Sequence, residues 1–263
     1  MAESAFFLPL GGDRYQPTEH TSGPWTPDAQ HFGPPSALLV RALEALPSSR
    51  EASLARVTVE ILGPAPLTEI SVRARVERPG RSVELLSAEL AAAGRPVARA
   101  SAWRIATGDT REVATGDGPA WPEPDECEPA RWPEGWFGGY LAAMEWRHVS
   151  GAVAGPGPAA VWARQRVALV DDEEPSPLQR LFAVADSGNG VSNTLAPARW
   201  WFINSELTVH VRRAPAGEWI GLDAVTAIGP GGVGTATSTL RDLDGPVGVG
   251  AQALMVRTRR PVP

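Results

Sequence analysis

The sequence predicts an α+β protein made of two similar halves, each with one helix followed by a long run of antiparallel strands. Two β-rich segments repeat at a constant spacing: Val57 matches Leu207, an offset of 207 − 57 = 150. Pro96 matches Pro246 at the same offset, 246 − 96 = 150, so the two segments begin and end in step. An apolar stripe of helical period precedes each segment, and turn-forming pairs of residues divide the segment into strands.

One helix is expected at the start of each half. The first is predicted at Pro34–Ala45, where apolar residues recur at helical spacing and proline occupies the first turn. The second is predicted at Pro177–Ser187, with Ser176 as the N-cap. Gly188 and Gly190 are expected to end this second helix.

Antiparallel strands are expected after each helix. In the first half they run through Ile70–Gly94, with a turn at Pro79–Gly80. In the second half they run through Glu218–Arg257, with turns at Pro230–Gly232 and Asp244–Gly245. A curved sheet of this kind would bury the apolar stripe of each helix on its concave face.

The middle of the chain has a different composition. Thr107–Pro133 is rich in Gly, Asp, Glu and Pro and has neither helical nor strand period, so it is interpreted as a linker or surface excursion. This divides the chain into an N-terminal unit at 1–106, the linker at 107–133 and a C-terminal unit at 134–263.

Composition limits the class of protein. Hydrophobic residues make up 43% and charged residues 21%, which supports a large core and excludes global disorder. The net charge of −6 argues against a nucleic-acid partner, because such proteins usually present a basic face. No stretch approaches the ~20 apolar residues of a membrane span, and the N-terminus lacks the features of a signal peptide. We therefore expect a cytoplasmic protein.

Residue counts also exclude several kinds of chemistry. All 24 basic residues are Arg, so mechanisms that need a lysine are excluded. Cys127 is the single cysteine, and its acidic neighbours should raise its pKa, which argues against a nucleophilic role. No metal site is expected, because the four histidines are widely spaced: His20, His31, His148 and His210. The sequence contains no G-x-S-x-G, H-E-x-x-H or phosphate-loop motif.

Four segments carry a resemblance to a known family. They are LFAVADSGNGVSN (Leu181–Asn193), WFINSELTVHVRRAPAGEW (Trp201–Trp219), DLDGPVGVGAQALMVR (Asp242–Arg257) and HFGPPSALLVRALE (His31–Glu44). With these segments the chain resembles the acyl-CoA thioesterases of type II, over most of its length outside the linker. The resemblance implies a double hotdog, in which two fused helix-plus-sheet repeats share one continuous sheet and the C-terminal repeat carries the active site.

The resemblance also implies a reaction and its residues. The reaction is hydrolysis of an acyl-CoA thioester to free acid and CoA by direct attack of water, without a cofactor or a covalent acyl-enzyme. Asp186 falls on the family's catalytic Asp, and Gln252 falls on its Gln. Asn204 stands where the best-known bacterial pattern has Thr, so its role is less closely matched. Asp186 is expected to accept a proton from water, while Asn204 and Gln252 hold the water and polarise the thioester.

The residues themselves leave two interpretations open at each position. Asp186 lies at the edge of a buried helical stripe, where a carboxylate needs hydrogen bonds or a raised pKa, but it could also form a local turn. Gln252 lies in an apolar strand and would need buried partners, unless it faces outward. Asn204 could be an ordinary turn residue.

The duplication supports a single site. At the offset of 150, Gln252, Asn204 and Asp186 fall on apolar or small residues of the first half, which are Ala102, Leu54 and Ser36. A purely structural role should tend to persist in both halves, so this difference favours one functional site in the second half.

Two groups of residues are expected to bind the substrate. His31 and Gly33 open the first helix, and His31 is expected to cap it beside the thioester. CoA carries phosphates, which arginine binds well. The candidate phosphate ligands are Arg212, Arg213, Arg257, Arg259 and Arg260.

Two other functions remain open. The protein could be a non-catalytic acyl-CoA or lipid-binding hotdog, or a hotdog enoyl-CoA hydratase or dehydratase that uses His31. Convergence of Asp186, Asn204 and Gln252 in one cavity would favour the thioesterase. A homodimer or higher oligomer is expected, because single hotdogs pair and exposed sheet edges could pair chains further.

Overall fold

The computed structural model describes residues 5–116, 118–153 and 155–259. The elements of the first half are β1 (Ala5–Gly11), β2 (Arg14–Pro17), η1 (Glu19–Thr21), α1 (Gly33–Glu44), β3 (Ala52–Ile61), β4 (Ile70–Arg78), β5 (Val83–Ala92) and β6 (Arg95–Ala106). Two short 3-10 turns follow, η2 (Arg111–Val113) and η3 (Pro124–Glu126). The elements of the second half are α2 (Gly139–Ala143), β7 (Met144–Gly151), β8 (Ala159–Gln165), β9 (Ala168–Val170), α3 (Pro177–Ala185), α4 (Gly188–Val191), β10 (Trp200–Asn204), β11 (Glu206–Val211), β12 (Ile220–Ile228), β13 (Val233–Asp242) and β14 (Gly245–Thr258).

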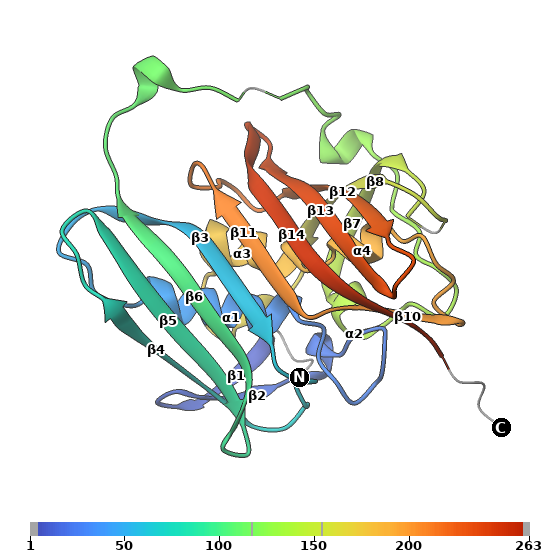
Figure 1. Ribbon diagram of the computed structural model, residues 1–263, viewed down its shortest axis with the longest axis horizontal. Coiled ribbons are helices and arrows are strands. Elements are labelled where there is room, and N and C mark those ends of the chain that lie inside the picture. The colour runs from blue at the N-terminus through green and yellow to red at the C-terminus, as the bar shows by residue number, and fades with distance from the viewer. Residues whose placement is uncertain (1–4, 117, 154, 260–263) are drawn as a thin grey trace.

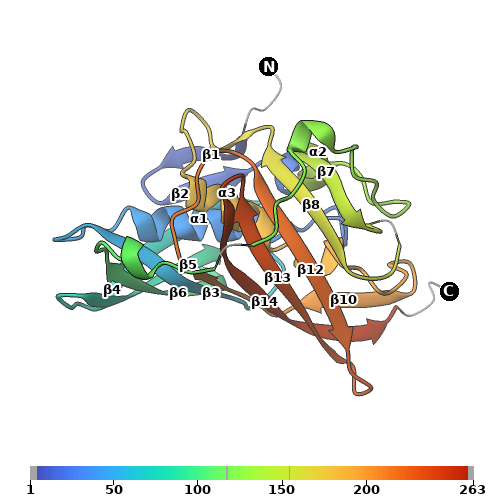
Figure 2. The same cartoon turned by 90° about the horizontal axis from the view of Figure 1, so that it is seen from above.

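One continuous sheet joins the fourteen strands of the described residues (Figure 1). Its order is β7-β8-β12-β13-β14-β11-β3-β6-β5-β4-β2-β1-β9, and β10 pairs with β14 beside this path. All pairs of named strands are antiparallel except β1 with the short edge strand β9. Helices α1 and α3 pack against each other on the concave face (Figure 2). The predicted α+β class and the double hotdog architecture are therefore confirmed.

The two halves meet where β3 pairs with β11. Thr58 lies directly opposite Thr208, and their Oγ1 atoms are 3.1 Å apart. These residues are separated by 208 − 58 = 150 positions, so each faces its own counterpart in the other half. This is the geometry of a residue on a twofold axis, and it supports the predicted repeat.

The hairpins keep the same offset. The β5–β6 pairing has an irregularity between Leu90 and Ala91, and the β13–β14 pairing has one between Leu240 and Arg241. Because both irregularities occur at matching positions, the offset of 150 holds through the sheets of the two halves.

The offset fails in the helices. Asp186 is the C-cap of α3, whereas Ser36 lies in the first turn of α1, whose N-cap is Phe32. The prediction that Asp186 matches Ser36 is therefore wrong. The residue at the corresponding end of α1 is its C-cap, Ala45. The reason is that α4 and a longer connection lie between α3 and the next strand, and they shift the register.

The end of α3 also differs from the prediction. The helix ends at Ala185, and Gly188 and Gly190 belong to the short helix α4 rather than terminating α3. Gly188 instead permits a close approach, because a Cβ there would lie 2.9 Å from Oε1 of Gln252.

The central segment packs on the protein. Trp121 and Cys127 lie with Trp162 and Trp219 in a small apolar cluster on the outer side of the sheet. Burial raises the pKa of the Cys127 thiol, with a smaller contribution from Glu126. Among the described residues, no helix combines the length and the apolar character needed to cross a membrane.

Candidate active site

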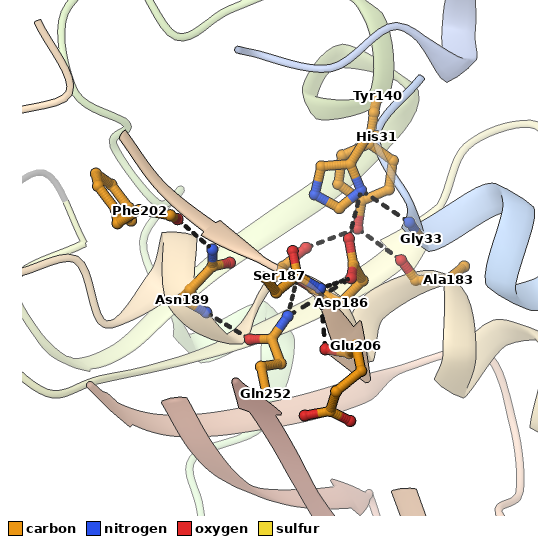
Figure 3. A network of polar contacts seen from close by, with 11 residues as sticks. His31, Gly33, Tyr140, Ala183, Asp186, Ser187, Asn189, Phe202, Glu206 and Gln252 are labelled. Atoms are coloured by element: carbon orange, nitrogen blue, oxygen red, sulfur yellow. Dashed lines mark hydrogen bonds and ion pairs between the residues drawn. The ribbon is translucent and has the colours of Figure 1, made fainter. Parts of the chain in front are cut away.

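Three polar side chains converge where the end of α3 meets β10 and β14 (Figure 3). Asn204 Nδ2 donates to Asp186 Oδ1 at 2.8 Å. Gln252 Nε2 donates to the Asp186 backbone oxygen at 2.9 Å and lies 3.5 Å from Oδ1. The exposed fractions of Asp186, Asn204 and Gln252 are 4%, 8% and 3%, so these contacts are shielded from water. The structure brings together all three residues that the sequence nominated.

Asp186 has a pKa that is unusual for a carboxyl group. Burial raises its pKa to about 7, although hydrogen bonds from Asn204, Gln252 and the Phe32 backbone lower it. Its place at the C-terminal end of α3 adds the negative end of the helix dipole, which also disfavours a carboxylate. A carboxyl group that titrates near neutral pH is suited to general-base catalysis.

The amide of Gln252 is fully engaged. Its Nε2 group faces Asp186, and its Oε1 accepts the backbone N–H of Asn189 at 3.0 Å. The Nδ2 group of Asn204 is likewise shared between Asp186 and the backbone oxygen of Glu206. The N–H groups of both amides therefore hold Asp186 in place. Neither amide bonds to its Oδ2 atom, so this carboxylate oxygen is left open.

His31 lies on the other side of Asp186. Its Nδ1 accepts the Gly33 backbone N–H at 3.0 Å and lies 3.5 Å from Asp186 Oδ2. Burial lowers the pKa of His31 to about 3, so the ring is neutral at physiological pH. Because Nδ1 acts as an acceptor, the ring proton belongs on Nε2. His31 thus accepts the N–H of the first residue of α1, although the N-cap of this helix is Phe32, which makes no side-chain capping bond.

Gly33 has two structural tasks. Its N–H is committed to His31, and a Cβ at this position would lie 2.3 Å from the backbone oxygen of Ala183. Only glycine allows α1 to begin this close to the end of α3.

Tyr140 and Asn189 complete the site and were not predicted. The Tyr140 ring stacks on His31 with centroids 3.8 Å apart, and its hydroxyl donates to the Ala183 oxygen at 2.7 Å. Ser187 Oγ lies 2.9 Å from the same hydroxyl. Asn189 donates to the Phe202 backbone oxygen at 2.9 Å. Tyr140 is one of only two tyrosines, which was the available sequence signal, but it follows the irregular central segment.

A cavity of about 530 Å³ opens over this network. Its polar side includes His31, Asp186, Asn189 and Asn204, with Gln252 behind them. The rest of the wall is mostly apolar and includes Trp25, Phe32, Ile61, Leu62, Pro64, Trp201, Ile203 and Met255. An apolar chamber with a few convergent polar groups is typical of a small-molecule site.

A second cavity, of about 920 Å³, lies at the opposite ends of α1 and α3. Arg212 and Arg213 line it, together with Glu44 and Ser176. The Arg213 guanidinium pairs with Asp242, and Arg212 donates to backbone oxygens of the central segment and of Pro246. The structure therefore does not bring these two arginines to Asp186.

The other predicted phosphate ligands lie near the end of β14. Arg257 donates to the backbone oxygens of Gly232 and Val256. Arg259 stacks on Trp201, in the wall of the first cavity. Arg260 lies outside the described residues. Within the described parts of the chain, no group of three or more His, Cys, Asp or Glu residues is placed to hold a metal.

Two family models match the chain. The acyl-CoA thioesterase N-terminal domain matches residues 21–105, and the acyl-CoA thioesterase C-terminal domain matches residues 124–256. A search of curated protein sequences finds no significant match.

Solved structures share the fold. A hot dog protein from Alicyclobacillus acidocaldarius is 17% identical, with a TM-score of 0.75 over 98% of each chain. The acyl-CoA thioesterase II from Mycobacterium marinum is 15% identical, with a TM-score of 0.69 over 98% of this chain and 96% of that one. At these identities the likeness shows the fold alone.

Proposed function

Because the chain belongs to the acyl-CoA thioesterase family, we propose that it hydrolyses acyl-CoA thioesters to a free acid and CoA by direct attack of water. The observation that carries this mechanism is the buried Asp186, with a pKa of about 7 and one carboxylate oxygen left open by the two amides. This oxygen belongs to a residue that lines the 530 Å³ cavity, within reach of a bound thioester.

In the proposed reaction, Asp186 Oδ2 accepts a proton as the water oxygen attacks the thioester carbon. The tetrahedral intermediate then collapses, the carbon–sulfur bond breaks, and the proton passes from Asp186 to the departing sulfur. No group on the protein is acylated, so atoms and charge balance with water as the sole co-reactant.

The geometry suggests a division of labour different from the one expected from sequence. Asn204 and Gln252 position Asp186, because their N–H groups are used on it and on backbone oxygens. The neutral His31 ring offers Nε2–H as the donor to the thioester oxygen. A neutral imidazole suits this task because it stabilises a developing oxyanion without first losing a proton.

The hydratase alternative finds little support in this geometry. A hydratase would need His31 as a base, but its Nδ1 is occupied by Gly33 and burial lowers its pKa to about 3. The binding-only alternative makes a different prediction for turnover, so it is tested together with the proposal.

The direct test is a screen of CoA esters from acetyl to palmitoyl, with free thiol measured over time. We expect turnover of at least one ester, and incorporation of one oxygen from labelled water into the acid. Tight binding without turnover would favour the binding-only hotdog, and a labelled acyl group attached to the protein would contradict direct water attack.

We further propose that the chain self-associates through the outer face of β12–β14. Val225, Val233, Val249 and Met255 are exposed there by 46%, 63%, 52% and 44%. Exposed apolar side chains on one face of a sheet can pair between two copies of a chain through a twofold axis. Light scattering should show a species larger than 27.9 kDa. Val249→Arg should shift it to the monomer mass, and a wild type that is monomeric throughout would contradict the proposal.

A further inference from the structure

Arg259 occupies an unusual position beside the candidate active site. Its guanidinium carbon lies 3.6 Å from the centroid of Trp201 and 5.8 Å from that of Trp25. Both indoles line the cavity that contains Asp186. Arg259 therefore adds a cation to the back of an aromatic wall of that cavity.

This cation has no counter-ion among the described residues. Its Nε is enclosed without a hydrogen-bond partner, and burial lowers its pKa because the charged form loses water. The neighbouring Arg257, by contrast, donates to two backbone oxygens. Arg259 as a whole is half-buried, so its guanidinium has lost part of its hydration without gaining a counter-ion from the described parts of the chain, and an anion supplied from elsewhere would compensate for this loss.

The length of β14 between the Asp186 side and the Trp201 side of the site is comparable to the length of a pantetheine arm. Gln252 contacts Asp186, and Trp201 lies opposite Arg257 in the β10–β14 pairing. The stretch of β14 from Gln252 to Arg257 spans about 17 Å at the rise of an extended strand. An extended pantetheine arm covers roughly 16 Å between its sulfur and the first phosphate, given ordinary bond lengths.

Resting on the proposed function, we propose that Arg259, seated on Trp201, binds the phosphates of the CoA portion of the substrate. A guanidinium matches phosphate oxygens in shape and charge, and its stacking on an indole fixes its plane. The thioester then lies at Asp186 and the pantetheine arm runs along the Trp201 side of the cavity. A carboxylate at the far end of an acyl chain has the same chemistry, so the experiment separates the two sources.

The test compares Arg259→Gln with wild type on two thioesters of one acyl group, the CoA ester and the N-acetylcysteamine ester, which lacks phosphates. The KM for the CoA ester should rise about tenfold or more, as for loss of a charge-assisted hydrogen bond, with kcat little changed. The KM for the N-acetylcysteamine ester should stay the same. Arg95→Gln removes an exposed charge from the first half and should change neither.

Three outcomes would overturn the proposal. An equal loss on both thioesters would mean that Arg259 only supports Trp201. An effect confined to succinyl-CoA and absent with butyryl-CoA would assign the anion to the acyl chain. Equal affinity of wild type and Arg259→Gln for free CoA, measured by calorimetry, would exclude a phosphate contact. Because free CoA binding needs no turnover, weaker binding by Arg259→Gln would support the site even if no ester were hydrolysed.

Discussion

The two cavities at opposite ends of α1 and α3 are built from matching positions of the two halves. The segment at 61–64 lines the first cavity, and its counterpart at 211–214 lines the second. Asn204 and Met255 in the first cavity correspond to Leu54 and Ile105 in the second. The two halves therefore form cavities from equivalent backbone positions, and the cavities differ in the side chains that line them.

A carboxylate near the end of each helix shows the difference most clearly. Glu44 accepts Ser176 Oγ on both of its oxygens, at 3.0 and 2.8 Å, and Gln179 Nε2 on one of them at 2.7 Å. In Asp186, the side-chain amides of Asn204 and Gln252 both lie near Oδ1. The other oxygen, Oδ2, lies beside the neutral ring of His31. Burial raises the pKa of both groups, but only Asp186 combines this with an oxygen free of side-chain donors. Burial is therefore common to both acids, and the oxygen without side-chain donors is what distinguishes Asp186 from Glu44.

The largest expected effect comes from removing the base. Asp186→Asn should lower kcat/KM by about 10³–10⁴-fold, because an amide cannot accept the proton from water. The measurement is thiol release, with circular dichroism to show that the variant is folded. Full activity in this variant would remove Asp186 from the mechanism.

The next largest effect is expected when a site residue of the second half is replaced by its counterpart in the first half. Gln252→Ala copies Ala102 and should lower kcat/KM by about 10²-fold, because the outer partners of a reacting group typically contribute this much. Its pH profile should also shift to higher pH, since a bond that lowers the pKa of Asp186 is lost. Gln179→Ala removes the corresponding amide bond to Glu44 and serves as the matched control, with activity unchanged. If Gln252→Ala lost activity without a shifted profile, Gln252 would not act through Asp186.

The pH dependence should follow Asp186. Activity needs the ionised carboxylate, so kcat/KM should fall about tenfold per pH unit below about 7 and level off above it. A folded-state pKa above the ordinary value means that the folded protein holds the proton more tightly. The associated stability is complete below about pH 4 and is lost as pH rises through about 7. The Tm of Asp186→Asn should therefore exceed that of wild type at pH 8 and converge with it at pH 4.

The smallest effect is expected at the second carboxylate. Glu44→Gln should leave kcat/KM within about threefold of wild type, a change of less than 1 kcal/mol. Its carboxylate touches the cavity that contains Arg212 and Arg213 rather than the one that contains Asp186. A loss as large as that of Asp186→Asn would mean that both cavities serve the reaction.

The outer faces of the two halves also differ. Arg75 and Arg99 lie on the outer side of the first half, and the residues 150 positions later are Val225 and Val249. Arg99 pairs with Glu89 across the strands, so the first half keeps a charged surface. This contrast supports self-association through the second half and solvent exposure of the first.

Much of the sheet could be predicted, because strand pairing keeps a period of two and turns mark its ends. The 150-residue offset matched Gln252 with Ala102. In the sheet Gln252 lies opposite Ala236 and Ala102 lies opposite Leu86, so the strand partners also correspond at this offset. The same offset misplaced Asp186, because insertions between helix and strand leave no trace in the periodicity of either. The three polar residues that the family resemblance nominated do converge, whereas the residue pattern alone left a local role open for each of them.

The remainder of the site depended on contacts between distant segments. Tyr140 reaches Ala183 and Ser187 across more than forty positions, and nothing in its neighbourhood marks it as buried. The orientation of the amides was also hidden, because a sequence shows which donors exist but not where they point. For this reason we propose His31, rather than Asn204 or Gln252, as the donor to the thioester oxygen.

The contact between Thr58 and Thr208 has a consequence for how such a protein can vary. In an assembly of identical subunits, a residue on the axis meets its own copy, so only groups that can pair with themselves are tolerated there. A hydroxyl satisfies this restriction because it both donates and accepts. In a single chain the two positions are encoded separately, and an acid could be placed opposite a base at the seam. The hydroxyl pair that joins the halves at 3.1 Å therefore meets the restriction of a symmetric assembly, although a single chain does not impose it.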